Sequence, residues 1–165
     1  MGRRDSIILR IRQNHALEHA TMYLLSRDDP TLRLVGRSDW DGFSLYGAVA
    51  TPAVLKAVVE ALGRLKHDES WLALHPRCGT NMAVSAALVS VAAYVAAVSP
   101  ARSPLGRLLR VLLATCAALI VARPLGAAVQ REITTSADLE GVHVRLVRRE
   151  AKGRLTAHRI VITRD

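Results

Sequence analysis

Two apolar runs constrain the fold of this 165-residue chain more than any other feature. Residues 82–98 carry no charged side chain, and residues 108–122 carry only Arg110. At about 1.5 Å per helical residue, the first run with its uncharged flanks approaches the roughly 30 Å thickness of bilayer hydrocarbon. The residues between the runs, SPARSPLGR, contain two prolines and Gly106, which end one helix and begin the next. The sequence therefore predicts a transmembrane helical hairpin over residues 82–123.

The alternative to a membrane hairpin is a pair of buried helices in a soluble domain. A single domain of this length could hardly surround two helices that are apolar on every face, so we favour the membrane. The net charge of +9 raises the question of nucleic acid, but no aromatic pattern for RNA binding accompanies it. Four of the surplus charges belong to the hairpin: Arg102, Arg107, Arg110 and Arg123. Membrane lipids with anionic head groups are therefore the expected partner, and nucleic acid is not.

The rest of the chain predicts an α+β fold. Residues 7–27 and 51–66 have the apolar spacing of amphipathic helices. Strands are predicted over residues 32–38, 43–50, 142–149 and 158–164, with turns at 39–42 and 150–153 and a short helix or turn at 124–132. Two hairpins can form one small four-stranded sheet against the helices. Three parts follow: residues 1–81, the inserted hairpin 82–123, and residues 124–165, which complete the α+β domain.

The first predicted helix contains the sequence His-Ala-Leu-Glu-His. His15 and His19 are four residues apart, so both imidazoles lie on one helix face and can bind one metal ion. The order His-x-x-Glu-His is the inverted form of the zinc-protease helix, in which the glutamate takes a proton from water. We therefore predict zinc as the cofactor, His15 and His19 as its ligands, and Glu18 as a general base.

A second group of reactive residues, HPRCGTN, directly precedes the first apolar run. Thr80 or Asn81 is the expected N-cap of the helix, which puts Cys78 near the positive end of the helix dipole, where a thiolate is favoured. Cys78 is the predicted third ligand. His75 is the alternative ligand, or a residue that orients substrate or hydrogen-bonds Cys78. Arg77 is either a catalytic residue that stabilises a developing oxyanion or an interface arginine.

These motifs resemble those of the YqhQ-like bacterial membrane proteins of unknown function, described as metal-dependent enzymes, and of a shorter related family of unknown function. The YqhQ-like proteins carry a GAEHKTIH-type helix, an HPRCGTS-type loop before a membrane segment, and a later glutamine with two threonines. The counterparts here are His15, Glu18, His19, His75, Arg77, Cys78, Gly79, Thr80, Gln130, Thr134 and Thr135. The chain departs from the pattern at Asn81, in its shorter length and in its fewer membrane segments. The resemblance implies a metal-dependent membrane enzyme.

Two functions follow from the residues. The first is an integral-membrane zinc-dependent hydrolase, with a metallopeptidase favoured, that acts on membrane-protein or peptide substrates at the membrane surface. The second is a non-catalytic membrane subunit or scaffold with a structural metal site. A third, weaker hypothesis makes Cys78 a nucleophile with His15 or His19 as its base. The Arg- and Ala-rich composition looks bacterial, so we expect the inner membrane, with the soluble part in the cytoplasm. The small residues of the hairpin allow a homo-oligomer or a membrane complex.

Four residues outside these motifs are expected to have simpler roles. His143 and His158 alternate with arginines on the predicted strands and are expected to face solvent. Gly36 and Gly42 are expected in turns.

Overall fold

The computed structural model describes residues 6–152 and 155–165. The chain forms two compact units. The first unit contains Met1–His75 and Arg131–Asp165, and the second contains Pro76–Gln130. The chain thus leaves the first unit after His75 and returns to it at Arg131. The inserted segment is longer at both ends than the predicted hairpin.

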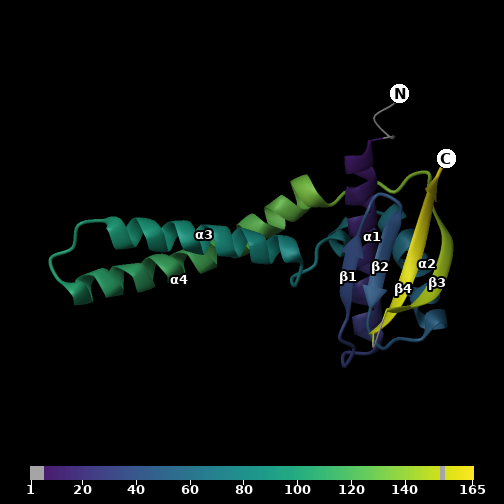
Figure 1. Ribbon diagram of the computed structural model, residues 1–165. Helices are drawn as coiled ribbons and strands as arrows, with labels where there is room; N and C mark the ends of the chain where they lie inside the picture. Colours follow the sequence, from purple (N-terminus) through teal and green to yellow (C-terminus); the bar gives the residue numbers. More distant parts are fainter. Residues whose placement is uncertain (1–5, 153–154) are drawn as a thin grey trace. The chain divides into compact units, whose positions relative to one another are not determined.

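An antiparallel four-stranded sheet in the described residues forms the frame of the first unit, with the order β1-β2-β4-β3 (Figure 1). Its strands are β1 (Val35–Ser38), β2 (Gly42–Tyr46), β3 (Val142–Lys152) and β4 (Leu155–Arg164). Two sequential hairpins join along β2 and β4, where Phe43 pairs with Ile160. The predicted single sheet is therefore confirmed. Residues 153 and 154 of the predicted second turn lie outside the described part of the chain.

Two helices, α1 (Ile7–Asp28) and α2 (Thr51–Lys66), cover one face of this sheet (Figure 1). Residues at helical spacing on both helices are buried together with Phe43 and Ile160 in a single core, among them Leu17, Leu24 and Val58. Each large side chain buried in this way contributes about 1.5–3 kcal/mol relative to exposure. Helix α2 has the predicted bounds because Pro52 favours its first turn.

The first two strands are shorter than the sequence predicts. β2 ends at Tyr46 because Gly47 adopts a φ of +153°, a conformation that disfavours any side chain. A Cβ at this position would also lie only 2.7 Å from the carbonyl oxygen of Arg33. The chain therefore leaves the sheet at Gly47 and reaches α2 through a short loop.

The second unit is an antiparallel helical hairpin of α3 (Gly79–Val98) and α4 (Pro104–Val129). Both helices are long and apolar enough to cross a membrane. Only 6 % of the most apolar window in α3 and 11 % of that in α4 are buried, unlike the core helices of a soluble protein. By length and composition, both helices are therefore candidate membrane spans.

Helix α4 continues six residues beyond the predicted end of the hairpin. It passes through Pro124 to Val129 and leads into a π-helical turn, η3 (Gln130–Thr134). Gly126 permits a close approach to the start of α3, since a Cβ there would lie 2.4 Å from Oδ1 of Asn81. The side-chain amide of Gln130 donates a hydrogen bond of 2.6 Å to the same oxygen. The residues predicted as a separate short helix are therefore part of the hairpin.

Candidate metal centre

The polar face of α1 is buried in the first unit. Gln13, Asn14, Glu18 and His19 are each at most 6 % exposed, and His15 is half-buried. Buried polar groups need hydrogen-bond partners, because desolvation without them is costly. This face of α1 therefore forms a polar site in the interior of the protein.

Both imidazoles on this face are oriented by backbone carbonyl groups. Nδ1 of His15 lies 2.9 Å from the carbonyl oxygen of Thr134, and Nδ1 of His19 lies 2.7 Å from that of Ala73. A carbonyl only accepts, so each Nδ1 carries a hydrogen, and in the neutral ring Nε2 then has the lone pair that a metal ion needs. This is the arrangement usual for metal-ligating histidines, whose second ring N–H is donated to a carbonyl or carboxylate. The two ring centroids are 4.2 Å apart.

Cys78 is itself the N-cap of α3. Its Sγ accepts a hydrogen bond of 3.4 Å from the backbone N–H of Thr80. The prediction that Thr80 or Asn81 caps this helix is therefore wrong, and Asn81 donates instead to the carbonyl of Pro76. The thiol is 6 % exposed and acts as an acceptor at the positive end of the helix dipole, which favours an anionic sulfur.

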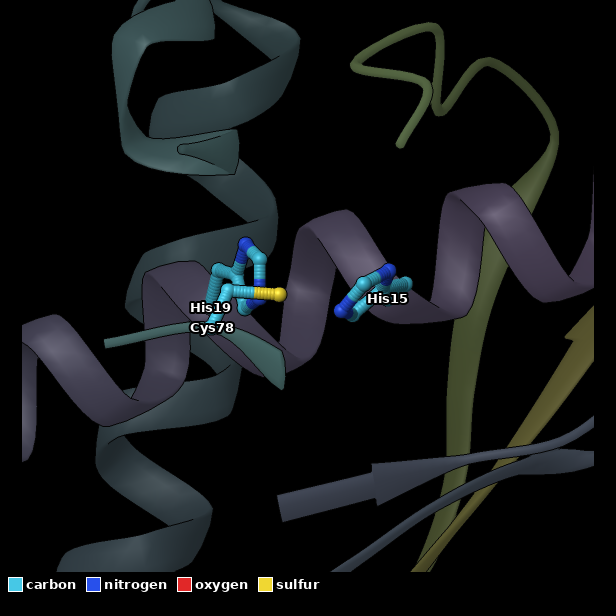
Figure 2. Close-up of side chains that lie close together, drawn as sticks. All are labelled: His15, His19 and Cys78. Atoms are coloured by element: carbon cyan, nitrogen blue, oxygen red, sulfur yellow. The ribbon is translucent and has the colours of Figure 1, made fainter. Parts of the chain in front are cut away.

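His15, His19 and Cys78 lie close together in the structure (Figure 2). One potential ligand atom from each lies within 4.8 Å of the other two. For comparison, the ligands of a tetrahedral zinc ion, bound at about 2.0–2.3 Å, are about 3.5 Å apart. The chain itself restricts the thiol to this region, because Cys78 follows His75 by three residues and the His75 ring lies 5.5 Å from that of His19.

The other two residues of the predicted loop site lie outside this cluster. His75 is close to His19, with an interplanar angle of 38°, but it does not belong to the group of ligand atoms. Arg77 is exposed. The substrate-orienting role of His75 and the oxyanion-stabilising role of Arg77 stay predictions.

Glu18 is held against the sheet. It is 5 % exposed and accepts a hydrogen bond from the hydroxyl of Ser38. Its carboxylate lies over Gly36, where a Cβ would come within 2.0 Å of Oε1. The expectation of a turn at Gly36 is therefore wrong and that of a strand over residues 32–38 is right at this position, since Gly36 lies in β1 and makes room for this carboxylate. Glu18 is not among the three clustered ligands, and its role as general base stays a prediction.

His158 is placed differently from the prediction. We expected it to face solvent, but it is fully buried on β4, with Nε2 3.0 Å from the hydroxyl oxygen of Thr51. Its Nδ1 is buried without a hydrogen-bond partner. Burial, with a smaller contribution from the charge of Arg149, lowers the pKa of His158 below its ordinary value. His143 is exposed, as expected, and contacts Asp165.

Of the two residues whose carbonyls orient the imidazoles, Thr134 was singled out only through the family resemblance, and Ala73 was not singled out at all. Thr134 and Ala73 contribute backbone carbonyls, which every residue type has. Arg12 donates to the backbone carbonyls of Glu132 and Thr135, on either side of Thr134. In the sequence, the one indication of this role is that Arg12 is a polar residue three positions before His15 and so lies on the same helix face.

The fold and this cluster define a class: a small α+β protein with an inserted apolar helical hairpin and a cluster of two histidines and a cysteine. Residues 10–147 match the family described as Domain of unknown function (DUF6391), and the chain belongs to this family. It is similar to an uncharacterized protein of Picosynechococcus sp. (strain PCC 7002), with 38 % identity over 141 residues that cover 80 % of this chain and 69 % of the relative. No solved structure matches the chain. These matches do not show the resemblance to the YqhQ-like proteins.

Proposed function

We propose that this protein is a membrane-associated, zinc-dependent hydrolase whose metal is held by His15, His19 and Cys78. The observation that carries the proposal is the pair of imidazoles, each fixed by a backbone carbonyl through Nδ1, beside a thiol that acts as an acceptor. Imidazole and thiolate ligands suit zinc, whereas magnesium and calcium prefer oxygen. Three protein ligands leave a fourth position, which is typical of a catalytic site.

Zinc held by these three residues would lower the pKa of a bound water to about 7 and so would supply a nucleophile at neutral pH. Glu18 is the residue of this chain proposed to accept the proton. It is buried one residue before His19, and the Ser38 hydroxyl holds its carboxylate. Arg77 is exposed, and its charge would stabilise an oxyanion at the mouth of the site.

We propose a peptide at the membrane surface as the substrate. The order His-x-x-Glu-His supports a peptidase, because the inverted motif is known from zinc peptidases. Cys78 directly precedes α3, a candidate membrane span, which supports a site near the bilayer. The resemblance to YqhQ-like membrane proteins and the cyanobacterial relative support a bacterial inner membrane, with the α+β unit proposed to face the cytoplasm.

A structural metal site is the second candidate, and the position of Glu18 favours it. The carboxylate is held by Ser38 and packed over Gly36, as expected for a residue that stabilises the fold. In this case the metal would tie Cys78 to α1, and the protein would have no hydrolase activity.

Metal analysis of the detergent-purified full-length protein tests the centre itself. We expect one zinc ion per chain in the wild type, and a sulfur-to-metal charge-transfer band when Co²⁺ replaces zinc. Cys78→Ser should abolish the band and lower the zinc content, because serine does not replace a thiolate ligand. Cys116→Ser is the matched control, since Cys116 is an exposed cysteine on α4. Equal zinc content in Cys78→Ser and the wild type would contradict the proposed ligand set.

Glu18→Gln separates the two candidate functions. The amide keeps the size of the side chain and can still accept from Ser38, so zinc content and thermal stability should stay close to those of the wild type. We expect cleavage of an unstructured protein substrate by the zinc-loaded wild type, reduced at least about a hundredfold in the variant, as for the loss of a general base. Cleavage at the wild-type rate would exclude Glu18 as the base, and zinc-loaded wild type without cleavage would favour the structural site.

A further inference from the structure

Arg12, on α1, donates hydrogen bonds to backbone carbonyls within the π-helical turn η3 and directly after it. Its Nη2 lies 2.9 Å from the carbonyl oxygens of both Glu132 and Thr135, and its Nε lies 3.1 Å from that of Thr135. The backbone N–H of Ser136 donates in return to the carbonyl of Arg12. The last carbonyls of a helix lack intrahelical partners, so the planar guanidinium supplies the missing donors.

The carbonyl that orients His15 belongs to the same short segment. Thr134 lies between the two residues whose carbonyls Arg12 binds, and its own carbonyl accepts from Nδ1 of His15 at 2.9 Å. Arg12 and His15 are three residues apart on α1 and therefore project from the same face. The segment is thus held on both sides of the one peptide group that fixes the tautomer and the direction of the His15 ring.

We propose that Arg12 is a positioning residue of the metal centre, which acts on the ligand nitrogen of His15 through the carbonyl of Thr134. This inference rests on the proposed metal site. Without the guanidinium, the segment would lose the bonds that flank Thr134, and the His15 ring could rotate away or protonate at its other nitrogen. Loss of such an outer partner costs about 10–100-fold in metal affinity.

Gln13 provides a matched control on the same helix. Its side-chain amide donates to the carbonyl of Asp138 at 2.7 Å, so it also fastens the returning chain to α1. It does not hydrogen-bond Glu132 or Thr135, the two residues that Arg12 contacts. A substitution of Gln13 therefore removes a hydrogen bond between α1 and the returning chain, but it leaves the hydrogen bonds on either side of Thr134 intact.

The experiment compares Arg12→Gln, Arg12→Lys and Gln13→Ala with the wild type as full-length proteins in detergent. Zn²⁺ affinity is measured by competition with a chromophoric chelator, the site geometry by the Co²⁺ absorption spectrum, and stability by thermal unfolding without metal. We expect Arg12→Gln to weaken Zn²⁺ binding at least about tenfold and to alter the Co²⁺ spectrum. Arg12→Lys should give an intermediate loss, because an ammonium cannot span both carbonyls as a planar fork does. Gln13→Ala should bind within about twofold of the wild type.

The outcomes separate this inference from the metal site on which it rests. Wild-type affinity and an unchanged Co²⁺ spectrum in both Arg12 variants would overturn the role of Arg12 while leaving the site in place. An equal loss of affinity in Gln13→Ala would also overturn it, since the effect would then come from loosening of the segment in general. If Arg12→Gln does not fold, Arg12→Lys carries the comparison. A wild type that binds neither ion would overturn the centre, and this inference with it.

Discussion

Gly36→Ala should destabilise the protein through Glu18. A methyl group at this position would lie 2.0 Å from Oε1, 2.4 Å from Cδ and 2.7 Å from Cγ of Glu18, all well inside van der Waals contact. Glu18 is 5 % exposed and held by Ser38, so it has little room to move away. Overpacking of this kind costs about 1–3 kcal/mol, partly offset by the 0.4–1 kcal/mol or so that alanine gains by restricting the unfolded chain.

We therefore expect a net loss of about 1.3 kcal/mol in the free energy of unfolding. For a chain of this size the loss corresponds to a fall in Tm of roughly 3–5 °C. The measurement is thermal unfolding of the full-length protein in detergent, followed by circular dichroism. Gly63→Ala is the matched control: nothing lies within 4 Å of its added Cβ, and alanine in a helix should raise stability by up to about 1 kcal/mol.

A double-mutant cycle with Glu18→Ala tests the cause. Truncation of Glu18 removes the three atoms that the new methyl group would meet, so the double variant should be more stable than the sum of the single effects predicts, by about 1 kcal/mol or more. Effects of the two substitutions that simply add, or a Gly36→Ala variant as stable as the wild type, would refute the contact between Glu18 and β1.

Two further predictions concern other parts of the chain. The lowered pKa of His158 means that the unfolded chain binds its proton more readily than the folded chain, so stability is complete above pH of about 6.5 and is lost as pH falls below it. The drop in Tm between pH 7.5 and pH 5.5 should therefore be smaller in His158→Asn than in the wild type, and equal drops would contradict this account. Gly126→Ala should lower the Tm of the hairpin because the methyl group would lie 2.4 Å from Oδ1 and 3.3 Å from Cα of Asn81. An unchanged Tm would show that the two helices are not in such close contact there.

Local sequence signals predicted the elements and the ligand pair. Helix α2 follows from Pro52 and an apolar stripe, and it has the predicted bounds. The four-residue spacing of His15 and His19 requires only a helix to bring the rings together, and α1 provides it. Cys78 was predicted as the third ligand from its place before an apolar helix, and the structure clusters its sulfur with both imidazoles.

The errors concern which face of a strand is covered. His158 has the same parity on β4 as Ile160 and Ile162, both in the core, so the period of two places its side chain inside. The alternation with arginines indicated that His158 and Arg159 face opposite sides of the sheet. The positions of Ile160 and Ile162 show which of these two sides is buried. The need for a glycine at position 36 could not be predicted in the same way, because it depends on the approach of Glu18 from another element.

The order of strands in the sheet has a consequence for synthesis. β2 gains its second neighbour only when the ribosome has made β4, more than one hundred residues later. At about 5–20 residues per second, this delay lasts roughly 5–20 s. The whole of α3 and α4 is translated within that interval. The apolar hairpin is therefore synthesised before the sheet has its last two strands, and its exposed apolar surface is present while β2 still lacks its second neighbour.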